Sequence, residues 1–257
     1  MNEINQTAAA DMFPSDLDRR TADLMRRLGI PEEIIDPAGP NGADVLFRHV
    51  REAVKNREDG CWRDLPEEIW MATMGCFPRF VGEHVRSYGY PGFDRGFWTS
   101  RQVEARLFRI GELEYELLEK DGRPFCVSIH IPSDARLEPD LLNRSVADCR
   151  AFLADRFPAW SGLPFRCESW LLSPLLREWL PETARIPGFQ RAFDIERVFP
   201  EDEEAVEWVF HVAGGQRDAF RLEEAPEDTL LQRRMKAHML SGGCPGAAEG
   251  MLARPFD

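Results

Sequence analysis

Two polar side chains on neighbouring predicted strands are of the types that act as general bases. His130 ends the alternating segment PFCVSIHI, and Glu168 lies within PFRCESWLL. A histidine titrates near neutral pH, and burial can raise the pKa of a carboxyl toward neutrality, so either group could act as a general base. We predict His130 and Glu168 as the catalytic residues, because neighbouring strands lie about 4.8 Å apart. The alternative is that both are ordinary strand residues satisfied by neighbours or solvent.

Two serines near Glu168 are candidates for contacts with substrate or with a water molecule. Ser169 follows the glutamate directly, and Ser173 precedes Pro174 in the segment SWLLSP. Ser173 is also a good N-cap for a helix that starts at the proline, which would account for it without substrate. The segment lacks the G-x-S-x-G elbow that exposes a nucleophilic serine, so a serine hydrolase is not expected.

The cysteine spacing, the apolar runs and the net charge argue against several other classes of protein. None of the six cysteines forms a C-x-x-C pair or lies at ligand spacing from a histidine, so we expect free thiols and no metal. The beginning of the chain lacks a signal pattern, and no apolar run approaches the ~20 residues of a membrane helix, which favours a cytoplasmic protein away from membranes. A net charge of -13 argues against nucleic acid as a partner. The oligomeric state stays open.

The periodicity of apolar residues changes along the chain, and it predicts the elements that position these candidate residues. Residues 1–96 read as helices, beginning with a helix capped by Ser15 and stopped by Gly29, and residues 97–257 form a second domain. In that domain the alternation in ELEYELLE and an Asp-Gly turn predict a three-stranded antiparallel meander over residues 106–131. The glutamates of the alternating strand are expected on its solvent face, where they could also attract a cationic amine.

A parallel step follows the meander. The helical pattern PDLLNRSVADCRAFLADRFP lies between the strand that ends at His130 and the strand that carries Glu168. Such a strand–helix–strand unit has parallel strands and a right-handed crossover. The turn at Ser173 would then lie beyond the carboxyl end of a parallel strand, where ligands bind in open α/β sheets. FQRAFDI and VEWVFHVA read as two more strands, and a helix capped by Thr229 and Gln232 follows them. The fold class is therefore α+β with a mixed sheet.

This order of elements resembles the GNAT acyltransferase superfamily. It is similar in particular to a two-domain bacterial family of predicted acyltransferases, which joins a helical N-terminal domain to a GNAT-like C-terminal domain. The segments that carry the resemblance are RLFRIGELEYEL (106–117), HIPSDARLEPDLL (130–142), CESWLLSPLLREWLP (167–181), FQRAFDI (189–195) and PEDTLLQRRMKAHMLSGG (226–243).

The resemblance implies an acyl-CoA, either acetyl-CoA or a longer one, bound in a V-shaped opening between the two parallel strands. The acceptor would be an amine of a small molecule or peptide, with an acidic residue or a chain of water taking its proton. A tyrosine often protonates the departing thiolate. The pantetheine arm would bond to the first strand and the pyrophosphate would meet the start of the crossover helix, which gives as cofactor-binding residues Val127, Ile129, Ile131, Ala135, Arg136 and Leu137.

The sequence departs from the superfamily pattern in two places. The segment IPSDARLEPD contains none of the glycines that usually let backbone N–H groups approach a phosphate, although Arg136 could supply charge. None of the three tyrosines lies near the helix after the second parallel strand. Two interpretations follow: an acyl-CoA-dependent N-acyltransferase, or an inactive GNAT-like module that binds a ligand or a partner.

Overall fold

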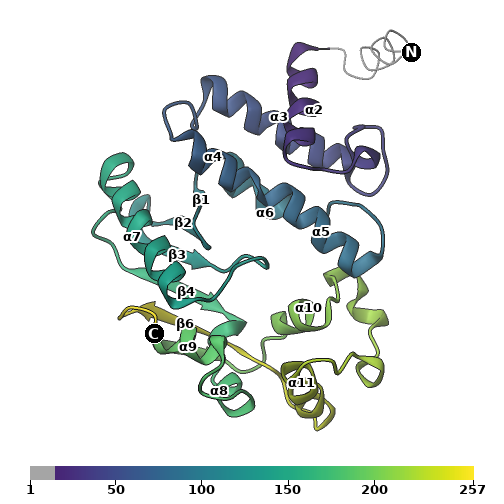
Figure 1. The fold of residues 1–257 in the computed structure, drawn as a ribbon, viewed down its shortest axis with the longest axis vertical. Helices are drawn as coiled ribbons and strands as arrows, with labels where there is room; N and C mark the ends of the chain where they lie inside the picture. Colours follow the sequence, from purple (N-terminus) through teal and green to yellow (C-terminus); the bar gives the residue numbers. More distant parts are fainter. Residues whose placement is uncertain (1–14) are drawn as a thin grey trace. The chain divides into compact units, whose positions relative to one another are not determined.

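The computed structural model describes residues 15–257, and the chain divides into two compact units (Figure 1). Unit 1 ends at Phe108 and consists mainly of helices, whereas unit 2 begins at Arg109 and is built around a mixed sheet. No helix in the described part of the chain is both long enough and apolar enough to cross a membrane.

The helices of unit 1 surround a core of large apolar side chains. Trp62 is fully buried, its Nε1 donates to the carbonyl of Gln102 at 2.9 Å, and its ring meets Phe108 edge-on at 5.3 Å. The elements are α2 (Asp16–Arg27), the 3-10 turn η1 (Glu32–Ile34), α3 (Ala43–Asp59), α4 (Glu67–Met74), α5 (Cys76–Tyr88) and α6 (Gly96–Val103).

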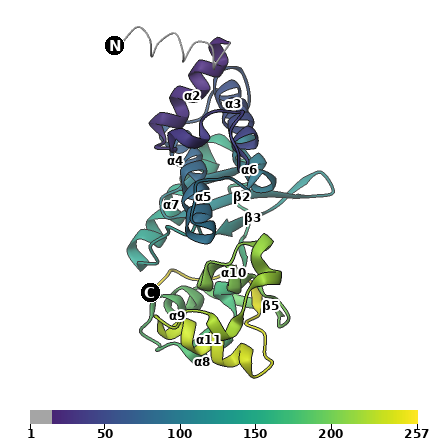
Figure 2. The ribbon, with the colours of Figure 1, turned by 90° about the vertical axis from the view of Figure 1, so that its right-hand side faces the viewer.

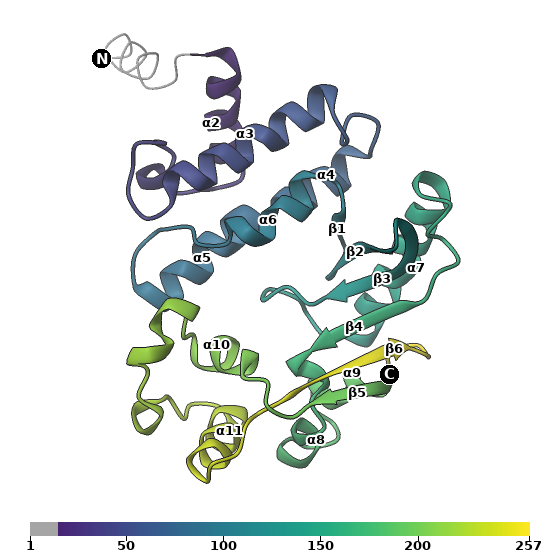
Figure 3. The same ribbon diagram turned by 180° about the vertical axis from the view of Figure 1, so that it is seen from behind.

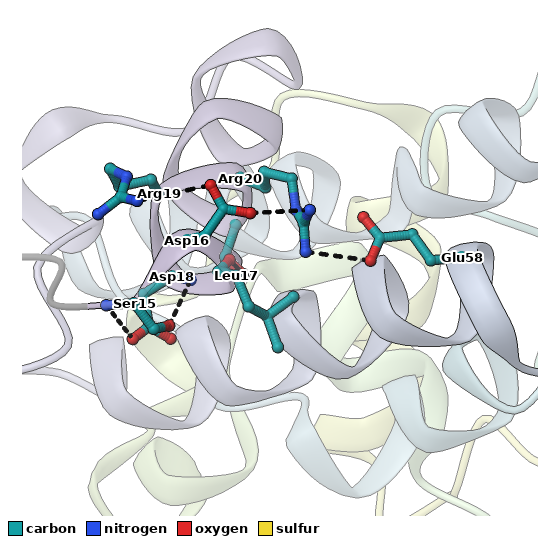
Figure 4. Close-up of polar contacts among 8 residues, drawn as sticks. Ser15, Asp16, Leu17, Asp18, Arg19, Arg20 and Glu58 are labelled. Atoms are coloured by element: carbon teal, nitrogen blue, oxygen red, sulfur yellow. Dashed lines mark hydrogen bonds and ion pairs between the residues drawn. The ribbon is translucent and has the colours of Figure 1, made fainter.

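Helix α2 begins where its capping residues predict. The Ser15 hydroxyl accepts from the Asp18 N–H at 3.0 Å, and the Asp18 carboxylate accepts from the Ser15 N–H at 3.3 Å, which forms a capping box (Figure 4). Arg20 bridges Asp16 of its own helix and Glu58 of α3. Gly29 follows the helix with a φ of 79°, as expected for a stop signal.

Unit 2 contains the sheet, in the strand order β1-β2-β3-β4-β6-β5. The hairpin between β2 and β3 turns at Asp121 and Gly122, whose φ angles of 53° and 69° suit a tight two-residue turn. The predicted meander is thereby confirmed. The strands are β1 (Leu107–Ile110), β2 (Leu113–Lys120), β3 (Arg123–His130), β4 (Phe165–Ser169), β5 (Phe193–Phe199) and β6 (Ala247–Leu252).

The predicted parallel step is also confirmed. Helix α7 (Pro139–Arg156) connects β3 to the parallel strand β4 and packs against one face of the sheet (Figures 1 and 3). On that face the Tyr115 hydroxyl lies 2.8 Å from the Ser145 hydroxyl of α7, and the Tyr115 ring lies 5.6 Å from the Phe165 ring. α7 therefore covers the face that carries Tyr115 and Phe165.

The last third of the chain differs from the sequence prediction. Residues 206–210 of the segment VEWVFHVA lie in a helix, α10 (Glu204–Phe210), and the segment leaves the helix at His211. Val206, Val209 and Phe210 form a buried stripe in one cluster with Met235 of α11 (Leu230–Leu240), and both helices are labelled in Figure 2. The final strand is instead β6, whose Gly250 lies so close to Asp194 that a Cβ would be 2.9 Å from the carbonyl oxygen. The remaining elements are η2 (Trp170–Leu172), α8 (Leu175–Trp179), α9 (Arg185–Arg191), α10 (Glu204–Phe210), η3 (Gly214–Ala219), η4 (Leu222–Glu224) and α11 (Leu230–Leu240).

Candidate active site

The parallel strands β3 and β4 pair over a short stretch and then separate. Within the described chain their register joins Val127 to Phe165 and Ser128 to Arg166, although β3 continues to His130 and β4 to Ser169. The main chain of β3 beyond Ser128 therefore has an edge that β4 does not occupy. An extended ligand with amide groups can bond to such an edge as an added strand does.

The register places the candidate catalytic side chains on one face of the sheet. Glu116 is opposite Ser128, and Ser128 is opposite Arg166. Because residues two apart in a strand share a face, His130 and Glu168 point to this same side. This face is opposite the one that α7 covers. The sequence left the register of β3 and β4 open, and the structure shows that both side chains lie on the same face.

His130 forms a close pair with Glu116. Its Nε2 lies 2.9 Å from Oε2 of the glutamate, with 22% of the histidine side chain and 9% of the glutamate side chain exposed. When Nε2 carries a proton, this carboxylate accepts it in a hydrogen bond. Glu116 thus has the geometry of a residue that orients a general base.

The glutamates just before and within β2 are buried, so the predicted solvent face is wrong. Glu112, Glu114 and Glu116 are 8%, 2% and 7% exposed. Alternation in a strand separates two faces, but it does not say whether a polar face meets water or protein. Here Glu116 binds His130, and Glu112 binds Arg136. Both contacts join residues that are far apart in the chain.

Arg136 and its neighbours form a loop that contains no glycine and that is held by ion pairs. The Arg136 backbone N–H donates to Glu112 at 2.8 Å, and its Nη2 donates to the same carboxylate at 2.7 Å. Arg109 holds Asp134 at 2.8 Å. Desolvation of Glu112 raises the pKa of its carboxyl, but the bonds from Arg136 outweigh this and leave the pKa below its usual range.

The loop leads directly into the start of α7. Ala135 closes a turn on Pro132, and Leu137 is half-buried. Pro139 occupies the first turn of α7, and the N-cap residue Glu138 makes no side-chain capping bond. Pro139 has no N–H, and the N–H groups of the two leucines that follow Asp140 bond to the Glu138 carbonyl, which leaves the Asp140 N–H to meet an anion. The helix begins on the carboxyl side of β3, at the end where the strands separate.

The remaining predicted cofactor contacts are main-chain ones. The side chains of Val127 and Ile129 are fully buried, so a ligand in the opening could reach only their backbone groups. Ile131 is half-buried and follows the last residue of β3. All six cysteines are free, and burial raises the pKa of the Cys167 thiol well above its usual range. Among the described residues no cluster of three or more histidine, cysteine, aspartate or glutamate side chains could hold a metal ion.

The serines of the turn after β4 hold the turn itself. Ser169 Oγ accepts from the Leu171 N–H and caps η2, whereas Ser173 Oγ donates to the carbonyl of Pro245 at 2.7 Å. The expectation that Ser173 caps the next helix is wrong, because η2 shifts the helix start and Pro174 occupies the N-cap of α8. Gln190 donates to the carbonyls of Leu171 and Ser173 and fixes the turn from α9.

Glu204 begins α10 and is an acidic residue that the sequence analysis did not single out. Although the side chain reaches solvent, desolvation of the carboxyl raises its pKa, and the charges of Asp202 and Glu168 act in the same direction. Reading VEWVFHVA as a strand concealed this residue, whereas helical spacing of its apolar residues would have placed Glu204 in a first turn.

A six-stranded mixed sheet, a parallel step that opens after two residue pairs, and a crossover helix that begins at this opening define a GNAT-type fold. Residues 107–252 match the family of the GNAT-like C-terminal domain, and residues 17–105 match the N-acyltransferase N-terminal domain. The chain belongs to this two-domain family of GNAT acyltransferases.

Solved structures of acyltransferases share the fold over nearly the whole chain. An acyltransferase in complex with decanoyl-CoA is 27% identical, with a TM-score of 0.73, covering 91% of this chain and 87% of that one. An acyltransferase in complex with decanoyl-CoA and teicoplanin is 24% identical, with a TM-score of 0.76 and the same coverage. A mutant acyltransferase with octanoyl-CoA is 24% identical, with a TM-score of 0.73, covering 92% and 88%. No curated protein matches the sequence significantly.

Proposed function

We propose that this protein transfers an acyl group from acyl-CoA to an amine of a small molecule or peptide. The observation that carries the proposal is the separation of β3 and β4 after Ser128 and Arg166, next to the uncapped start of α7. Membership in the two-domain acyltransferase family supports it. The similar structures contain decanoyl-CoA or octanoyl-CoA, which favours a medium-length acyl group over acetyl.

In this proposal the acyl-CoA lies along β3. Its pantetheine amides bond to the backbone of Val127, Ile129 and Ile131. The pyrophosphate meets the first turn of α7 and the backbone of the loop at Ala135, Arg136 and Leu137. The Arg136 side chain is 67% exposed even though it binds Glu112, so its remaining N–H groups can still approach a phosphate.

The chemical step is a direct attack of the neutral amine on the thioester carbonyl. His130, oriented by Glu116, takes the proton that the nitrogen loses, and Glu168 either shares this role or attracts the ammonium form of the acceptor. The C–S bond then breaks, and CoA leaves as a thiolate that takes a proton from water. Ser169 and Ser173 act in this scheme by holding the turn beside Glu168, where a substrate would pass.

Titration calorimetry with acetyl-, octanoyl- and decanoyl-CoA tests the binding step, and absence of binding to all three would contradict the proposal and favour an inactive module. His130→Ala and Glu168→Gln should each lower kcat by about 10²-fold or more and leave the Kd of acyl-CoA within a few-fold of wild type. Glu178→Gln is a matched control, because Glu178 is exposed on α8. Unchanged kcat in both site variants would remove them from the mechanism.

The thiols and the net charge of the chain bear on where the reaction takes place. We infer a reducing, cytoplasmic environment, with no nucleic acid or membrane as a partner. The six unpaired thiols and the net charge of -13 support this inference. Titration of thiols in protein purified from its own bacterial host without reductant should find six reactive groups after unfolding.

A further inference from the structure

A cavity of about 450 Å³ lies within unit 2, between one flank of α7 and the segment that follows β6. Small-molecule sites have volumes of roughly 300–1,000 Å³, so the cavity is large enough for a ligand. One wall is residues 252–256, and the helical wall consists of Asn143, Val146, Ala147 and Arg150. None of these residues belongs to the site proposed for acyl transfer.

The cavity lies on the opposite side of the sheet from that site. The guanidinium of Arg150 lies over the ring of Phe165, 4.5 Å from its centre, and Phe165 belongs to the face that α7 covers. His130 and Glu168 point to the other face. A ligand in the cavity would therefore be separated from the proposed reaction by the sheet itself.

The wall after β6 is held in place, so the cavity is preformed. The side-chain amide of Asn143 donates to the Phe256 carbonyl and its oxygen accepts from the Phe256 N–H, each at 2.9 Å. The Phe256 ring is buried, with its centre 5.4 Å from that of Phe189 and 6.0 Å from that of Phe193. A wall fixed in this way does not have to be ordered when a ligand binds.

The surface between the two walls is mostly apolar and reaches solvent. Val146 and Leu252 are half-buried, whereas Ala147, Ala253 and Pro255 are exposed. A hydrocarbon chain laid against these side chains would remove apolar surface from water on both partners, which favours binding.

Arg150 adds a positive charge at one end of the helical wall. No carboxylate of the described chain pairs with it, and its stacking on Phe165 leaves the N–H groups in the guanidinium plane available to an anion. Arg254 on the opposite wall already pairs with Asp194. The charge of Arg150 therefore favours a carboxylate over a neutral or cationic group at this end of the cavity.

The length of the helical wall limits the length of the ligand. Arg150 lies seven positions beyond Asn143, which corresponds to about 10 Å along a helix. A fully extended chain of single bonds advances about 1.2 Å per bond, so eight or nine bonds span roughly this distance.

We propose that the cavity binds a medium-chain fatty carboxylate of about eight to ten carbons, with its carboxylate at Arg150 and its chain between Val146 and Leu252. The inference goes beyond the proposed function, because binding at this place requires neither acyl-CoA nor an acceptor amine.

Titration calorimetry with decanoate, kept below the concentration at which it forms micelles, tests the proposal. Decanoate should bind more tightly than decanol, and decyltrimethylammonium should not bind. Arg150→Gln should weaken the binding of decanoate about 10-fold and leave that of decanol unchanged, because the variant removes a charge-assisted hydrogen bond. Arg144→Gln is the matched control, since Arg144 is exposed on the same helix outside the cavity.

A second pair of variants locates the bound decanoate. Ala147→Trp introduces a large side chain into the cavity from an exposed position and should abolish this binding. Ala151→Trp makes the same change at an exposed position of α7 outside the cavity and should leave binding as in wild type. Decanoate binding that Ala147→Trp does not alter would overturn the proposal, and so would displacement of decanoate by decanoyl-CoA or equal affinity for decanoate and decanol.

Discussion

The carboxylate of Glu116 lies 2.9 Å from Nε2 of His130 and is almost entirely buried, so it is poorly screened by solvent. In the proposed reaction, its charge would stabilise the imidazolium that forms when His130 takes the proton of the amine, as carboxylates do beside catalytic histidines. At the scale of single residues, we therefore propose Glu116 as a positioning residue that acts through His130.

Glu116→Gln should lower kcat by about 10²-fold and leave the Kd of decanoyl-CoA unchanged, because the amide can bond to the ring but carries no charge to stabilise its cationic form. Steady-state kinetics and calorimetry measure the two quantities separately. Glu119→Gln is the matched control, since Glu119 is exposed near the end of the same strand. A Kd that rises in parallel with the loss of kcat would point to damage to the sheet.

At the scale of elements, the site depends on strands and turns that cannot shift easily. Gln190 bonds to two carbonyls of the turn after β4, and Glu112 ties the loop before α7 to the start of β2. Buried bonds of this kind are costly to leave unmade. The start of a helix can be fixed in a similar way, by side chains that accept hydrogen bonds from N–H groups of the first turn. The capping box of α2 is an example (Figure 4).

Asp18→Asn should destabilise the protein at pH 7 and make little difference at pH 2. The Ser15 hydrogen bond, with help from Arg51 at 2.7 Å, holds the pKa of Asp18 below its usual range. The Asp18 carboxyl of the unfolded chain therefore binds a proton at a higher pH than that of the folded chain. The stabilisation from its charge is present above the pKa of the unfolded chain, and it is lost as the pH falls through the lowered pKa of the folded chain. Urea unfolding followed by tryptophan fluorescence measures the difference.

Asp23→Asn is the control for this experiment. Its carboxylate is 71% exposed and pairs with Arg26 on the same helix, so a change of well under 1 kcal/mol is expected at either pH. Ser15→Ala should cost about 1 kcal/mol at pH 7, the usual value of an N-cap side chain. Equal destabilisation by Asp18→Asn at both pH values would contradict the role of its charge.

At the scale of the whole molecule, a net charge of -13 acts on both substrates. An acidic protein attracts a cationic acceptor over distances that salt screens, with a Debye length of about 10 Å at 0.1 M. The same field opposes an anionic acyl-CoA, so the proposed contact of the pyrophosphate with the start of α7 would have to offset this repulsion.

Raising the salt concentration should therefore lower kcat/KM for a cationic amine acceptor. A dipeptide amide, which carries a free amino group and no carboxylate, should lose several-fold between 0.02 and 0.3 M salt by the screening argument. The same dipeptide with a free carboxylate has no net charge and should change much less. Identical salt dependence of the two acceptors would exclude electrostatic attraction of the amine.

Much of the fold follows from local patterns in the sequence. The Ser15 cap, the Asp121–Gly122 hairpin and the parallel step around α7 were all predicted, because each depends on the conformational preferences of a few consecutive residues. The strand β6 was not predicted, because its Gly250 is required by the close approach of a neighbouring strand, which the local sequence does not reveal. α10 was taken for a strand because short apolar runs fit either element.

The sequence by itself determined the parallel step and the residue types available for base catalysis, since these follow from periodicity and local propensity. Only the tertiary structure decided that the glutamates before and within β2 are buried and that Glu116 meets His130. The physical reason is distance along the chain. Contacts between residues 14 and more positions apart depend on strand register and on packing between elements, and neither quantity is encoded by neighbouring residues.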